Sequence, residues 1–142
     1  MIDPRGQRFA AALTTLVLAL ALLSGSTWLL LAQALVFATG LALGPAASPY
    51  AWLFRTAVRP RLGPPAELED AAPPRFAQGC GLAFTLVALV GVALGAPVLT
   101  TVALSAALAA AFLNAAFGFC VGCEIYLRLR RAGVRLPLSS NT

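Results

Sequence analysis

Two long stretches without a charged side chain constrain this protein more than any other feature of its sequence. Residues 9–54 contain no Asp, Glu, Lys or Arg, and neither do residues 76–123. One helical membrane crossing needs about 20 apolar residues, so each stretch is long enough for two crossings joined by a tight turn. Residues 24–26 (Ser-Gly-Ser) and 94–97 (Leu-Gly-Ala-Pro) interrupt the stretches near their middles, as turns would.

The composition agrees with this and excludes other classes of protein. Hydrophobic residues make up 60% of the chain, charged residues only 11%, and the mean hydropathy is +0.87. Soluble domains carry about 25% charged residues, so a soluble globular enzyme and a disordered chain are both excluded. Because the alternation of a membrane β-barrel is also missing, we expect an all-α integral membrane protein.

The predicted architecture is a single transmembrane domain over residues 1–142, built as a four-helix bundle of two helical hairpins. We expect helices over about residues 5–24, 27–43, 75–94 and 97–127. Residues 44–74, which are rich in proline, are predicted to form a cytoplasmic loop, and residues 133–142 a tail.

The basic residues predict how the helices are oriented. All of them are arginine, and they fall in the N-terminal segment, the central loop and the C-terminal tail, with none in the two short turns. An even number of crossings puts those three segments on one face, which the positive-inside rule makes cytoplasmic. We therefore expect a multi-pass protein of the cell (inner) membrane with both termini in the cytoplasm. The formal charge of +5 then reflects topology and anionic lipid rather than nucleic acid.

The two halves of the chain follow a similar plan. Arg8-Phe9-Ala10 opens the first half and Arg75-Phe76-Ala77 opens the second. Each half then runs as helix, turn and helix, and ends in aromatic and basic residues at 50–55 and 126–128. This pattern predicts an internal repeat about an axis along the membrane normal.

Chemistry is concentrated at the end of the last predicted helix. Cys120 and Cys123, spaced i and i+3, share a helix face with Cα atoms about 5 Å apart, within disulfide range. Cys80 can reach the same membrane level, and Glu124 follows the pair directly. We therefore take Cys120, Cys123, Cys80 and Glu124 as candidate catalytic residues.

The local structure around the cysteine pair stays open at this point. If Gly118 and Gly122 break the helix, Cys123 begins a new helix whose N-terminus favours the thiolate. If the helix is continuous, its C-terminus and Glu124 disfavour the thiolate. The chain contains no histidine, so hydrolase chemistry with the usual general base is a poor interpretation.

Three polar side chains are candidates for binding a substrate. Asn114 shares a helix face with Gly118, Gln78 lies near Cys80, and Arg128 follows the cysteine pair. The alternatives are an interhelical hydrogen bond for Asn114 and an i, i+4 ion pair between Glu124 and Arg128.

Several motifs resemble DUF4395, a bacterial membrane family of unknown function. They are Asp3-Pro4-Arg5 before Phe9, Ser48-Pro49-Tyr50, the segments 59–63 and 74–78, and residues 114–124, with Phe119-Cys120-x-x-Cys123-Glu124 the most specific. The family is similar in plan to DoxX- and MauE-type four-helix membrane proteins. Its members often occur beside thioredoxin-like or rhodanese-like proteins, which implies thiol redox or sulfur transfer carried by Cys120 and Cys123.

The leading hypothesis is a membrane thiol–disulfide oxidoreductase or sulfur-relay protein with a cytoplasm-facing CxxC. Its partners would be the lipid bilayer and a thioredoxin-like or rhodanese-like protein on the arginine-rich face. One alternative is a small transporter or a metal or sulfur carrier, as a homo-oligomer around a central path. Zn or Cu is less favoured than a redox disulfide, because closed zinc sites use four ligands. The other alternative is a non-catalytic membrane anchor.

Overall fold

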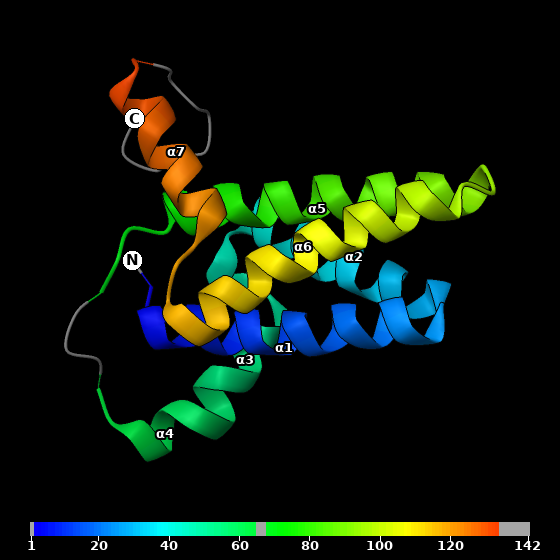
Figure 1. Cartoon of the computed structure of the whole chain (residues 1–142). Helices are drawn as coiled ribbons and strands as arrows, with labels where there is room; N and C mark the ends of the chain where they lie inside the picture. Colours follow the sequence, from blue (N-terminus) through cyan, green and yellow to red (C-terminus); the bar gives the residue numbers. More distant parts are fainter. Residues whose placement is uncertain (1, 65–67, 134–142) are drawn as a thin grey trace.

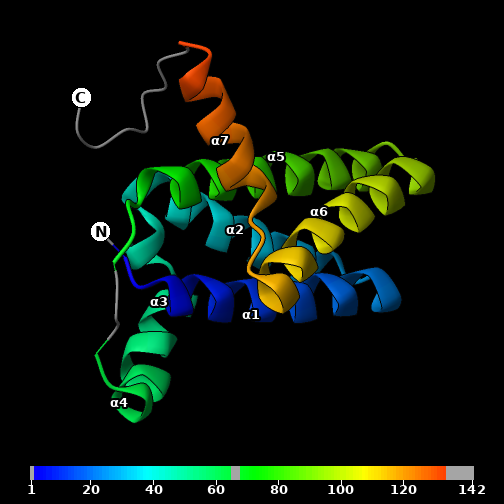
Figure 2. The same ribbon diagram turned by 60° about the vertical axis from the view of Figure 1, so that its left-hand side comes forward.

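The computed structural model describes residues 2–64 and 68–133. Most of these residues form helices, joined by short turns and links, with one isolated bridge between Ile2 and Glu69, so the all-α prediction is confirmed. Four long helices extend in one general direction, and shorter helices gather at one of their ends (Figures 1 and 2). In chain order the elements are α1 (Pro4–Ser24), α2 (Thr27–Leu43), η1 (Pro45–Ala47), α3 (Pro49–Leu53), η2 (Phe54–Val58), α4 (Arg59–Leu62), α5 (Ala72–Ala93), α6 (Pro97–Phe117) and α7 (Val121–Arg131).

Side chains and glycines at the helix ends explain where the long helices begin and stop. Asp3 caps α1 by accepting the Arg5 N–H, and Ser26 caps α2 by accepting the Leu29 N–H. Gly25 ends α1 in the left-handed conformation at φ 70°, which glycine adopts without steric cost. Pro97 occupies the first turn of α6, where its missing N–H is harmless.

The outer surface of the described helices is apolar. The side chains of Leu23, Trp28 and Val98 are 84%, 81% and 74% exposed. The helices α1, α5 and α6 are long and apolar enough to cross a membrane, whereas α2 is apolar but has only 17 residues. An apolar surface of this extent fits a membrane protein, because in water it would drive aggregation.

The interior is packed through small residues and a few leucines. Helix α1 packs against α6, and α2 packs against α5, so each half of the chain contacts the other. Close approach of α5 and α6 needs Gly91, where an added Cβ would lie 2.9 Å from the backbone nitrogen of Thr100. Such small-residue contacts are how helices associate in lipid. The central buried cluster contains Leu18, Leu30, Ala88, Ala103, Leu104 and Ala107.

Two predicted boundaries differ from the structure. The helix expected over residues 97–127 is two helices, because Gly118 takes the left-handed conformation at φ 68° and ends α6. The predicted loop 44–74 contains η1, α3, η2 and α4, since prolines at 45, 49 and 60 each start a short helix, and α5 already begins at Ala72. The predicted tail, with Arg135, lies outside the described residues except for Gly133.

The contacts made by the two halves repeat, as the paired Arg-Phe-Ala motifs predicted. Arg8 donates hydrogen bonds to the carbonyls of Ala115 and Ala116 at the end of α6. Arg75 donates in the same way to Leu41 and Ala42 at the end of α2. The phenylalanines that follow also correspond: the ring of Phe9 lies 5.7 Å from that of Phe54, and the ring of Phe76 lies 5.7 Å from that of Tyr126. Each opening motif thus anchors its helix to both halves.

Candidate functional site

A disulfide joins Cys120 and Cys123 at the N-terminus of α7, with the two Cα atoms 5.2 Å apart. Cys120 is the N-cap residue of the helix, and its Sγ accepts the backbone N–H of Cys123 at 3.1 Å. Of the two arrangements that the sequence left open, the chain therefore adopts the broken helix. The break lies at residues 118–120 and α7 begins at Val121, so Gly122 does not break the helix and Cys123 is not its first residue. An N-terminal position favours negative charge, which is the charge of a cysteine thiolate.

Two contacts hold α7 against α5. Gly122 allows a close approach, because an added Cβ would lie 2.6 Å from the Cα of Ala77. One turn later, the buried side chain of Tyr126 packs on Phe76, and its hydroxyl accepts a hydrogen bond from Arg130. The disulfide therefore stands on a helix that is fixed to the rest of the molecule.

Gln7 is a site residue that the sequence analysis missed. Its side-chain amide extends from the first turn of α1 and donates a hydrogen bond to Cys123 Sγ at 3.4 Å. A donor at this position stabilises negative charge on the sulfur. The signal that could have found Gln7 is its place beside Arg8, at the level where the cysteines were already expected to meet.

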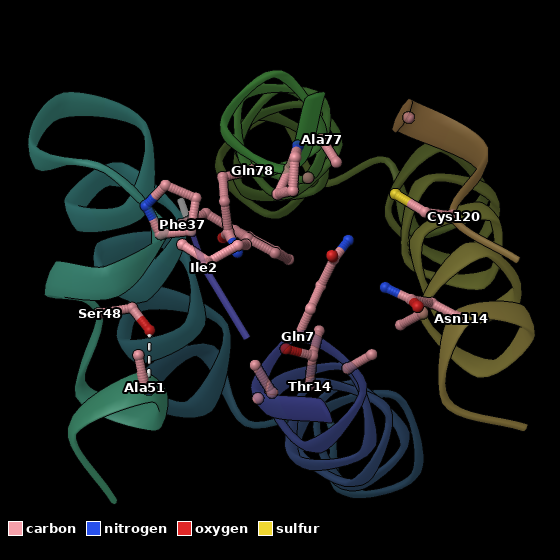
Figure 3. Close-up of a pocket in the computed structure, with 18 of the residues that line it drawn as sticks. Ile2, Gln7, Thr14, Phe37, Ser48, Ala51, Ala77, Gln78, Asn114 and Cys120 are labelled. Atoms are coloured by element: carbon pink, nitrogen blue, oxygen red, sulfur yellow. Dashed lines mark hydrogen bonds between the residues drawn. The ribbon is translucent and has the colours of Figure 1, made fainter. Parts of the chain in front are cut away.

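A cavity of about 390 Å³ lies beside the disulfide, bordered by α1, α2, α5, α6, α7 and the short helices between residues 45 and 62 (Figure 3). It brings together four of the predicted site residues. These are Cys80, Gln78, Asn114 and Cys120, and Gln7 joins them from α1. Cys80 is partly buried and is the free cysteine of the chain.

The remaining three predicted site residues, Cys123, Glu124 and Arg128, do not line this cavity. Glu124 sits in the first turn of α7, where a carboxylate complements the helix dipole. Arg128 is exposed one turn later on the same helix. Within residues 2–64 and 68–133, no ion pair joins Glu124 to Arg128, so the expected i, i+4 contact is not formed.

An ion pair lies at the arginine-rich end of the cavity. Asp3, which lines the cavity, is paired with Arg5 at 2.9 Å. The hydrogen bonds from the Arg5 guanidinium lower the pKa of the Asp3 carboxyl below its ordinary value, although burial opposes this. The carboxylate therefore remains ionised and compensated at neutral pH.

No metal centre emerges from the part of the chain that the structure describes. Within it, no three His, Cys, Asp or Glu side chains come close enough together to hold a metal ion. The metal-carrier alternative therefore finds no ligand set among these residues.

Comparison with known proteins identifies one family. The family model for the domain of unknown function DUF4395 matches residues 2–131, which includes the whole site described above. No curated protein and no solved structure matches the chain. The protein therefore belongs to the DUF4395 family.

Proposed function

We propose that this protein is a membrane thiol–disulfide protein whose redox centre is the pair Cys120 and Cys123. The observation that carries the proposal is the disulfide at the N-terminus of α7, in which one sulfur caps the helix and the other accepts a hydrogen bond from Gln7. After reduction, the same N–H groups and the helix dipole would stabilise a thiolate at this place.

The reaction is an exchange with the dithiol of a thioredoxin-like partner. A partner thiolate attacks one sulfur of the pair, breaks the S–S bond and forms a mixed disulfide. The second partner thiol then displaces the cysteine, which leaves the partner oxidised and this pair reduced by two electrons. The reverse sequence oxidises the pair. Transfer of a persulfide sulfur from a rhodanese-like partner would use the same two residues.

The proposed setting is the bacterial inner membrane, crossed four times with both termini on the cytoplasmic side. The start of α1, the segment α3–α4, the start of α5 and helix α7 lie at one end of the long helices (Figures 1 and 2). These segments carry the described arginines, as the positive-inside rule requires of cytoplasmic segments. Helix α2, with 17 residues, is about 26 Å long, close to the thickness of the hydrocarbon core.

The test is thiol exchange in vesicles that contain the purified protein. Wild type, the Cys120→Ser/Cys123→Ser double variant and Cys80→Ser are each mixed with a reduced thioredoxin-like protein, whose oxidation is followed. We expect wild type and Cys80→Ser to oxidise the partner, at one disulfide per chain, and the double variant to be inactive. Equal oxidation by all three proteins would contradict the proposal.

A further inference from the structure

Helix α7 leaves the bundle at the end where the arginines gather. It begins beside the first turns of α5 and runs crosswise to the four long helices, away from the other elements, in both views (Figures 1 and 2). It is held there by Gly122 against Ala77 and by Tyr126 on Phe76. From Leu127 to Arg131 every side chain except that of Leu129 is exposed. The second half of α7 is therefore not covered by the described protein.

The contacts of α7 place it at the edge of the membrane-spanning region. Arg75 is the last charged residue before the uncharged stretch of the second half, and it bonds to the carbonyls that end α2. The next residue, Phe76, is the one on which Tyr126 packs. Because α7 crosses the long helices at this level instead of continuing along them, it runs along the surface of a bilayer that surrounds the bundle.

Two kinds of side chain are exposed on this helix. Those of Ile125 and Leu127 are 44% and 40% exposed, and they lie about 100° to either side of Tyr126 around the helix. The last turn carries three arginines, Arg128, Arg130 and Arg131. Exposed apolar side chains followed by arginines are typical of a helix in the headgroup layer, where the aliphatic stems contact lipid and the guanidinium groups reach the phosphates.

The arginines of α7 lack the charged or carbonyl partners that other arginines have. Arginines near the starts of α1 and α5 bond to a carboxylate or to carbonyls at helix ends: Arg5, Arg8 and Arg75. Among the described residues, Arg128 and Arg131 bond to none through their guanidinium groups, and Arg130 bonds to the uncharged Tyr126 hydroxyl. No described carboxylate pairs with any of the three. The last turn thus presents positive charge that matches a negatively charged surface.

We propose that α7 is an interfacial helix whose last turn binds the headgroups of anionic phospholipids. Lipid covers the exposed apolar side chains, and Arg128, Arg130 and Arg131 lie among the phosphate groups. Net negative charge is needed, because a zwitterionic headgroup already carries a cation beside its phosphate. The disulfide, at the other end of α7, is thereby held at the membrane surface. This inference rests on the proposed membrane setting and not on redox activity of the cysteines.

Hydrogen–deuterium exchange of the full chain in lipid nanodiscs tests the proposal. Nanodiscs expose both faces of the bilayer, so the result does not depend on orientation. One set contains phosphatidylcholine alone, and the other contains phosphatidylcholine mixed with phosphatidylglycerol. We expect the backbone amides of residues 125–131 to exchange about tenfold more slowly in the anionic discs, and salt to reduce the difference. Amides in the middle of α6 should exchange equally in both lipids.

Two triple variants test the role of charge. Arg128→Gln/Arg130→Gln/Arg131→Gln should exchange alike in both lipids, whereas lysine at the same three positions keeps the charge and should keep most of the lipid dependence. Slow exchange in α6 shows that each variant is folded. Equal exchange of α7 in the two lipids for wild type would overturn the proposal and leave these arginines to an acidic protein partner. An undiminished lipid dependence in the glutamine variant would overturn it as well. Inert cysteines in thiol exchange would alter none of these expectations.

Discussion

The two halves of this protein present helix caps of the same geometry but different chemistry to one cavity. After α2, the hydroxyl of Ser48 caps α3 by accepting the Ala51 N–H at 3.1 Å. After α6, the sulfur of Cys120 caps α7 by accepting the Cys123 N–H, also at 3.1 Å. Both caps line the cavity (Figure 3). The scaffold is therefore common to both halves, and two sulfur atoms distinguish the proposed redox site from an ordinary helix cap.

The halves also differ in how firmly the capped helix is held. Helix α3 has five residues and runs directly into η2, whereas α7 has eleven and packs on α5 through Gly122 and Tyr126. Within the part of the chain that the structure describes, a side-chain donor bonds the i+3 residue of the second cap only: Gln7 donates to Cys123 Sγ. A redox centre benefits from such fixation, because exchange depends on which sulfur is accessible and how its charge is stabilised.

The largest expected effect comes from making the second cap resemble the first. Cys120→Ser keeps an N-cap acceptor but removes the disulfide, so we expect complete loss of the two-thiol redox step with the helix content unchanged. Maleimide labelling counted by intact mass, together with circular dichroism, measures both. Loss of helix content in this variant would show that the sulfur, and not the cap, maintains α7.

The reciprocal exchange gives the first cap the two cysteines of the second and tests whether the two caps have the same geometry. Ser48→Cys combined with Ala51→Cys places two thiols on the first cap, and the matching cap geometry predicts a second disulfide. Labelling should then reveal a second two-thiol step, whereas Ser48→Cys alone should add one thiol that stays reactive at every potential. If the double variant shows three free thiols after Cys120 and Cys123 have oxidised, the two caps are not equivalent scaffolds.

The next effect concerns the docking of α7. Gly122→Ala forces a methyl group against the Ala77 backbone, which should cost about 1–3 kcal/mol of unfolding free energy. Gly79→Ala is the matched control, since its new methyl group would meet the flexible Leu41 side chain at 3.2 Å. Thermal unfolding in detergent should show a clear loss for the first variant and a small change for the second. Equal changes would argue against close docking of α7.

A smaller effect is expected from the paired arginines. Arg8→Met and Arg75→Met each remove hydrogen bonds to the carbonyls at the end of a helix from the other half, at a cost of about 1 kcal/mol. Both should lower the unfolding temperature by similar amounts. Arg8→Met should also shift the midpoint reduction potential of the disulfide, because Arg8 lies beside the link between α6 and α7. Arg75→Met should leave that potential unchanged. Identical midpoints in the two variants would contradict this asymmetry.

The smallest effect is expected from Gln7→Leu. Loss of its hydrogen bond to Cys123 Sγ destabilises the thiolate of the reduced form, so the midpoint potential should fall by roughly 10–30 mV. Gln78→Leu, which alters the same cavity without removing a bond to sulfur, should leave the potential unchanged. A redox titration of the two variants beside wild type measures the difference, and a rise in potential for Gln7→Leu would contradict the stated role.

Much of the helical framework could be predicted because its causes are local. The uncharged stretches, the turn at Gly25 and the proline at residue 97 located the long helices, and the expected segment 27–43 agrees with α2 at both ends. Whether Gly118 or Gly122 breaks the last helix could not be decided from the sequence, since Gly91 and Gly122 lie inside helices without ending them. Whether a glycine ends a helix or lies inside one depends on its position in the fold.

Site residues that depend on tertiary contact were harder to predict. The cysteine pair was evident from its spacing, and the candidates Cys80, Gln78 and Asn114 line one cavity with Cys120. Gln7 was missed because it and Cys123 are 116 positions apart. The short helices between residues 45 and 62 were missed because proline marks both loops and the first turns of helices.

The proposed redox centre at Cys120 and Cys123 is tested most directly by a redox titration of the purified wild-type protein. The protein is equilibrated in dithiol buffers of known potential and trapped with a maleimide, and the labelled cysteines are counted by intact mass and located by peptide mapping. We predict one step of two thiols, mapping to Cys120 and Cys123, with Cys80 labelled throughout. Three labelled thiols across the whole range of potentials would contradict it.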